Sequence, residues 1–157
     1  MTEPRRLLIG LGNELRGDDA AGLLVARAAR GREPVGVDVV ERPGEPIDLL
    51  DAWEGAEVAL VADAVVSGAE PGTVHRVDAA AGPLPAAFAG TSTHALGLAD
   101  AIELGRTLER LPPRLVVFGI EGSDFAAGDR AGDAVLAAVQ RVARLALAEL
   151  ARAEEGG

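Results

Sequence analysis

The sequence predicts an α/β protein: a single three-layer α/β/α sandwich around a mostly parallel, twisted sheet of about five strands. Short apolar runs alternate with longer segments of helical periodicity along the chain. This order is typical of parallel sheets covered by helices. The apolar runs show little polar alternation, as in Val58–Ala62, so they suit strands that are covered on both faces.

The predicted strands and helices follow one another along the chain. We expect strands at Leu7–Leu11, Val35–Glu41, Val58–Ala62, Thr73–Val77 and Leu115–Gly119. We expect helices over residues 19–30, 46–50, 94–110 and 131–151, a loop over residues 79–89 and a frayed tail over residues 152–157. Thr73–Val77 has mixed polarity and follows a Pro71-Gly72 turn, which favours an edge position in the sheet. The last helix carries one apolar stripe, formed by Val135, Val139, Val142, Ala146 and Leu150.

Length and composition limit the possible functions. The 157 residues fit one domain, residues 1–157, which can bury about two-thirds of its unfolded surface. The net charge of −10 opposes binding to nucleic acid or to an anionic membrane, because both need a basic surface. The chain has no cysteine and no lysine, which excludes disulfides, thiolate metal sites, Schiff bases and the phosphate-loop lysine.

The apolar runs and the N-terminal residues predict the location. No run approaches the roughly 20 residues that span a bilayer, and no signal peptide precedes the first strand. We therefore expect a cytoplasmic protein.

A glycine-rich turn joins the first predicted strand to the first helix. It begins at Gly10-x-Gly12 and ends at Asp18-Asp19. Such turns usually bind phosphate through backbone N–H groups, but two adjacent carboxylates repel an anion. We expect Asp18 to cap the helix and Asp19 to face a cleft. We expect Gly10 and Gly12 to let a partner chain approach the backbone.

Three polar residues fall at the carboxyl ends of the predicted strands, where open α/β sheets bind ligands. Asp19 follows the first strand, Asp63 ends the third, and His94 opens a helix. Two carboxylates and one imidazole suit a divalent transition metal, and two close carboxylates can share a proton in acid–base catalysis. Each residue alone also fits a structural role, as a cap, a turn residue or a solvated side chain.

Other polar residues fit functional motifs less well. His75 lies in the predicted edge strand, and we expect it to be solvated. The serines at positions 67, 92 and 123 lack the nucleophile-elbow pattern. Gly17 follows Gly12 by five residues rather than by the three of the dinucleotide fingerprint, so a nucleotide-binding α/β module is the weaker alternative.

Several ordered motifs resemble the nickel–iron hydrogenase maturation endopeptidases. They are Gly10-x-Gly12-Asn13 with Gly17-Asp18-Asp19, then Ala62-Asp63-Ala64, and then Thr93-His94 through Asp100. The resemblance implies one twisted sheet between two helical layers. It also implies an endopeptidase that removes a C-terminal extension from a hydrogenase large-subunit precursor after nickel insertion.

The resemblance also implies the roles of the site residues. Asp19, Asp63 and His94 are expected to contact nickel that belongs to the substrate, and Asp19 and Asp63 are the candidate catalytic residues. An aspartic-type and a metal-assisted mechanism both stay open. We expect a monomer with no nucleotide, haem or iron–sulfur cofactor. A non-proteolytic nickel-sensing assembly factor would need the same ligands and is the other alternative.

Overall fold

A computed structural model describes residues 5–12, 17–85, 88, 97–123 and 130–155. The strands are β1 (Arg5–Leu11), β2 (Val37–Arg42), β3 (Ala56–Val65), β4 (Val74–Asp78) and β5 (Arg114–Glu121). The helices are the 3-10 helix η1 (Gly17–Ala20) and the α-helices α1 (Ala21–Ala29), α2 (Pro46–Trp53), α3 (Leu98–Thr107) and α4 (Asp133–Glu155). The strands form one sheet in the order β2-β1-β3-β5-β4.

The sheet is parallel except at one edge. β2, β1, β3 and β5 run parallel, whereas β4 pairs antiparallel with β5. The predicted edge position of the strand after Pro71-Gly72 is therefore confirmed. Because β4 runs in the opposite direction, its first residues lie at the same end of the sheet as the last residues of β3 and β5.

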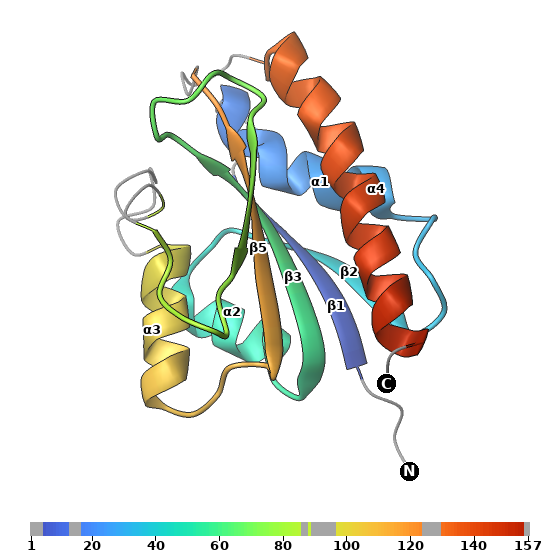
Figure 1. Cartoon of the computed structure of the whole chain (residues 1–157), viewed down its shortest axis with the longest axis vertical. Coiled ribbons are helices and arrows are strands. Elements are labelled where there is room, and N and C mark those ends of the chain that lie inside the picture. The colour runs from blue at the N-terminus through green and yellow to red at the C-terminus, as the bar shows by residue number, and fades with distance from the viewer. Residues whose placement is uncertain (1–4, 13–16, 86–87, 89–96, 124–129, 156–157) are drawn as a thin grey trace.

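Helices cover both faces of the sheet, which confirms the predicted three-layer sandwich. α1 and α4 lie on one face, and α2 and α3 lie on the other (Figure 1). Side chains alternate between the two cores: Leu60 and Val116 face α1 and α4, whereas Val61 and Val117 face α2 and α3. The predicted apolar stripe of α4 is buried. None of the helices within the described ranges is both long and apolar enough to cross a membrane.

Some boundaries differ from the predicted ones. α4 ends at Glu155 instead of residue 151, because no helix-breaking residue occurs before the final glycines. α3 ends at Thr107 instead of residue 110. There the chain turns out of the helix through Glu109, whose φ is 56°. The N–H of Arg110 then bonds back to the Gly105 carbonyl at 2.7 Å, a helix ending that usually carries glycine at the residue with positive φ.

Glycines bring α1 very close to the sheet. A Cβ on Gly10 would lie 2.3 Å from the Gly22 carbonyl oxygen, and a Cβ on Gly22 would lie 2.2 Å from that of Ala62. At Gly12, where φ is +145°, a Cβ would lie 2.1 Å from the Asp19 carbonyl oxygen. The same chain therefore fills the space in the Cβ direction of Gly10 and Gly12, and the approach of a partner chain to this backbone stays a prediction. This close packing places η1 at the carboxyl edge of the sheet.

Candidate active site

Asp19 and Asp63 lie near each other at the carboxyl edge of the sheet. Asp19 belongs to η1, which packs against β3, and only 4% of the residue is exposed. Asp63 is near the end of β3, in register with Gly119 of β5. The charge of Asp19 acts on the Asp63 carboxyl. The structure thus brings together two of the three residues that the sequence predicted for the site.

The ionisation of Asp63 is strongly perturbed. Desolvation by the surrounding protein raises the pKa of Asp63 to about 7, and the charge of Asp19 adds to this effect. The Ala64 N–H donates a 2.8 Å hydrogen bond to Oδ1, which acts in the opposite direction. A carboxyl group with a pKa near neutrality can both accept and release a proton under physiological conditions. Such perturbed groups are typical of catalytic sites.

The third predicted ligand, His94, lies outside the described residues, as do Thr91, Ser92 and Thr93. Within the described part of the chain, no group of three or more histidine, cysteine or acidic side chains could hold a metal ion. Asp100, which ends the same sequence motif, has a structural role. It accepts a 3.2 Å hydrogen bond from the Gly97 N–H at the start of α3.

Asp18 has a different partner from the one we predicted. It does not cap α1, whose N-cap residue is Ala20 and has no side-chain cap. Its buried carboxylate instead accepts hydrogen bonds from the N–H groups of Ser123 at 2.8 Å and Gly132 at 2.9 Å. Asp18 therefore ties the turn before α1 to the end of β5 and the start of α4, while its neighbour Asp19 lies near Asp63.

A second polar cluster occupies the β4–β5 part of the same edge. Nε2 of His75 lies 3.0 Å from Oε1 of Glu121, so His75, which we expected to be solvated, is only partly exposed and contacts a buried carboxylate. The N–H of Ser67 lies 3.0 and 3.1 Å from the two Glu121 oxygens, and the Ser67 hydroxyl also donates to Oε1. Burial alone would raise the pKa of Glu121, but the hydrogen bonds from Ser67 and His75 lower it.

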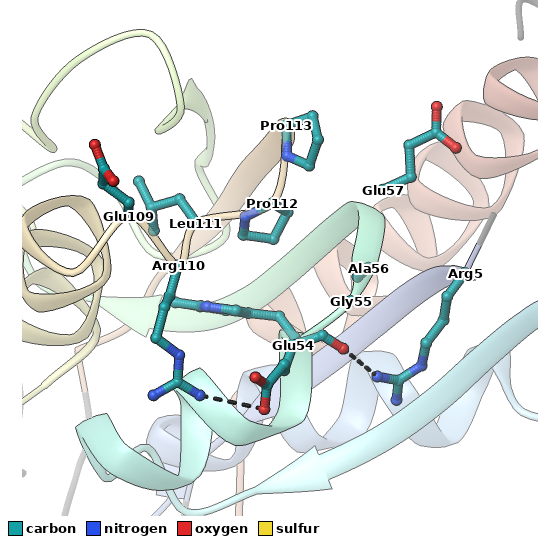
Figure 2. A pocket seen from close by; sticks show the side chains of 11 residues that line it. Arg5, Glu54, Gly55, Ala56, Glu57, Glu109, Arg110, Leu111, Pro112 and Pro113 are labelled. Atoms are coloured by element: carbon teal, nitrogen blue, oxygen red, sulfur yellow. Dashed lines mark hydrogen bonds and ion pairs between the residues drawn. The ribbon is translucent and has the colours of Figure 1, made fainter.

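A cavity lies at the opposite end of the sheet. It has a volume of about 740 Å³ and lies between the start of β1, the α2–β3 connection and the α3–β5 connection. Both arginines of its lining contact Glu54 (Figure 2): Arg5 donates to the Glu54 carbonyl at 3.2 Å, and Arg110 to the Glu54 carboxylate at 3.3 Å. Arginine side chains thus contact Glu54 here, whereas Asp63 at the carboxyl edge lies near the like charge of Asp19.

The fold and the two neighbouring aspartates, Asp19 and Asp63, together indicate the class of protein. It is an α/β/α sandwich whose candidate acid–base and cation site lies beyond the carboxyl ends of the parallel strands. This is the position at which open α/β sheets bind their ligands.

Sequence comparison identifies the family. The sequence model of the hydrogenase maturation protease family, HycI, matches residues 24–149. The hydrogenase expression/formation protein HoxM of Azotobacter vinelandii is 30% identical over 156 residues, which cover 96% of this chain and 74% of HoxM. The hydrogenase 2 maturation protease of Escherichia coli K12 is 31% identical over 120 residues, 74% of this chain and 72% of the relative. The chain belongs to the hydrogenase maturation protease family.

Solved structures agree with this assignment. The hydrogenase maturating endopeptidase HybD from E. coli has a TM-score of 0.78 at 27% identity, over 95% of this chain and 93% of HybD. HycI from Thermococcus kodakarensis has a TM-score of 0.72 at 25% identity, over 93% and 91% of the two chains. The match to HupD of Thiocapsa roseopersicina, 28% identical, spans only 55% of that relative's length. The fold and the membership of a peptidase family are confirmed.

Proposed function

We propose that the protein is an endopeptidase that removes the C-terminal extension of a nickel–iron hydrogenase large-subunit precursor after nickel has been inserted. The observation that carries the proposal is the pair of carboxylates at the carboxyl edge, Asp19 and Asp63, in a chain of this family. The names of its relatives, a maturation protease and a maturating endopeptidase, support the same reaction.

The nickel in this proposal belongs to the substrate. Asp19, Asp63 and His94 would contact it from the side of the enzyme, with two oxygen ligands and one nitrogen ligand. The chain has no cysteine, so it lacks the soft thiolate ligands that would compete with the precursor for the metal. The substrate's nickel would act as a recognition element and would polarise the carbonyl of the bond to be cut.

Asp63 would carry the proton in the hydrolysis. As the oxygen of a water molecule bonds to the carbonyl carbon, the Asp63 carboxylate accepts a proton from that water. The C–N bond then breaks, and the proton passes to the leaving amine. A carboxyl with a pKa of about 7 suits both transfers, because it accepts and releases protons near neutral pH. This role belongs to the aspartic-type mechanism. In a metal-assisted mechanism Asp19 and Asp63 would instead act as ligands to the substrate's nickel.

Mass spectrometry of the precursor tests the proposal. Incubation of the nickel-loaded precursor with the wild-type protein should release a short C-terminal peptide. Asp19→Ala and Asp63→Ala should each slow the release at least about 100-fold, since positioned acid–base groups contribute factors of this size. Asp51→Ala removes an exposed carboxylate of α2 and should cleave at the wild-type rate.

Two outcomes would contradict the proposal in different ways. A precursor that binds the wild-type protein but keeps its full mass would favour a nickel-sensing assembly factor. Normal cleavage by both aspartate variants would leave the reaction in place and reject the site.

A further inference from the structure

Three residues of the sheet lie in one row at the carboxyl edge. Gly119 of β5 pairs in register with Asp63 of β3 on one side and with His75 of β4 on the other. Residues in one row share a face of the sheet. Here it is the face toward α2 and α3. Val61 and Val65 lie two residues from Asp63, and Val117 lies two residues from Gly119, so they share this face, and all three pack in the core on that side. Two strand spacings separate the Cα atoms of Asp63 and His75, or about 10 Å.

The ring of Phe88 fills the space above the glycine of this row. A Cβ on Gly119 would lie 2.8 Å from Cε1 and 2.9 Å from Cζ of Phe88. The imidazole of His75 meets the same ring edge-on, with a centroid distance of 6.2 Å and an interplanar angle of 75°. Phe88 is only 9% exposed. The ring therefore lies between the positions of Asp63 and His75, with Gly119 beneath it.

A buried carboxylate fixes the orientation of His75. Glu121 is fully buried and accepts hydrogen bonds from His75 and from both donors of Ser67. An ionised carboxylate can only accept, so Nε2 of His75 carries the proton. Carboxylates commonly orient a functional histidine through one ring N–H in this way. The side chain of His75 is 30% exposed, so the pair lies at the border of the site and not in the core.

We propose that His75 is a positioning residue for the proteolytic site: held by Glu121, it fixes the Phe88 ring over Gly119 as a wall beside Asp63. This inference rests on the proposed function, because the wall matters only if the precursor is cut at Asp63. The ring would contact the precursor segment next to the cut bond. Loss of its position would then weaken precursor binding and leave the proton transfer at Asp63 in place.

Steady-state kinetics with nickel-loaded precursor tests this role. His75→Gln keeps an N–H donor for Glu121 but removes the ring that meets Phe88. We expect KM to rise about tenfold, in the range found when an orienting partner is lost, while kcat changes little. Gly119→Ala moves the Phe88 ring without altering His75 and should raise KM similarly. The control Arg76→Gln, which breaks the ion pair with Glu149 on the other face of β4, should leave KM unchanged.

A double-variant cycle separates positioning from general loss of structure. If His75 acts through Phe88, then His75→Gln in a Phe88→Leu background should add no further rise in KM. Additive effects, or a wild-type KM for both His75→Gln and Gly119→Ala, would overturn the inference while the proposed function stands.

A measurement on the free protein needs no substrate. The chain has three phenylalanines, so fluorophenylalanine labelling gives three ¹⁹F signals, and Phe88→Leu identifies that of Phe88. His75→Gln should shift the Phe88 signal, whereas Arg76→Gln should not. An unchanged signal would overturn the inference. Failure of the wild-type protein to cleave the precursor would reject the proposed function and, with it, the role of the ring in precursor binding. The ¹⁹F signal would then still report whether His75 positions the Phe88 ring.

Discussion

The two halves of the carboxyl edge shift the pKa of an acidic side chain in opposite directions. In the β1–β3 half, burial and the neighbouring Asp19 raise the pKa of Asp63 to about 7, against the opposing hydrogen bond from the Ala64 N–H. In the β4–β5 half, Glu121 is fully buried, yet its pKa is lowered because Ser67 and His75 donate to it. Burial alone therefore does not decide the charge of a carboxyl group. The hydrogen-bond donors and the charges around the carboxyl group decide whether it is ionised.

This difference separates Asp63, the proposed proton-transfer group, from Glu121, a structural group. The folded protein stabilises the ionised form of Glu121 with hydrogen bonds, so this carboxylate holds its surroundings in place. It disfavours the ionised form of Asp63, so this carboxyl is poised to exchange a proton. Groups such as Asp63, whose ionised form is disfavoured by the fold, reduce stability and are typical of catalytic sites.

Removal of Glu121 should cause the largest loss of stability. Glu121→Ala leaves the donors of Ser67 and His75 without their shared acceptor and creates a cavity, so we expect a loss of about 3 kcal/mol in the free energy of unfolding. Urea denaturation at pH 7 measures it. Glu121→Gln keeps the shape and one acceptor oxygen, and should cost about 1 kcal/mol. A loss below about 1 kcal/mol for Glu121→Ala would show that the hydrogen bonds to Glu121 do not stabilise the β4–β5 half of the edge.

The pH dependence of Glu121 has a definite sign. Its pKa in the folded protein lies below the value in the unfolded chain, so its stabilisation is present above the unfolded pKa of about 4.3. It is lost as the pH falls through the folded pKa. The stability difference between wild type and Glu121→Gln should therefore shrink under acidic conditions.

Replacement of Asp63 should change stability in the opposite direction. The folded pKa is raised, so ionisation destabilises the folded protein as the pH rises from about 4 to about 7. Asp63→Asn removes that cost while it keeps an acceptor for the Ala64 N–H. With a chelator present, the variant should be more stable than wild type at pH 8 by up to about 4 kcal/mol, at about 1.4 kcal/mol for each pKa unit of the shift, with little difference at pH 4. A variant less stable than wild type at pH 8 would contradict the raised pKa.

Sequence periodicity predicted the fold and the proximity of Asp19 and Asp63 at the carboxyl edge. Apolar runs located the strands, and parallel strands bring their carboxyl ends to one edge, so the sequence alone was enough to place Asp19 and Asp63 together. The position of His94 remains a prediction.

The other contacts of the edge join residues far apart in the chain. His75 reaches Glu121 only because β4 returns antiparallel in a particular register, which the pattern Thr73–Val77 does not specify. Asp18 bonds to Ser123 and Gly132, more than a hundred residues away. A helix cap was the only local interpretation that the sequence offered for Asp18. Its real partners depend on how the chain folds around the sheet.

The most direct test of the account is a crystal structure of the protein soaked with cadmium or nickel. Our account predicts one ion at the β1–β3 half of the edge, with carboxylate oxygens of both Asp19 and Asp63 as ligands. An ion bound by Glu121 and His75, with none between the two aspartates, would contradict the account.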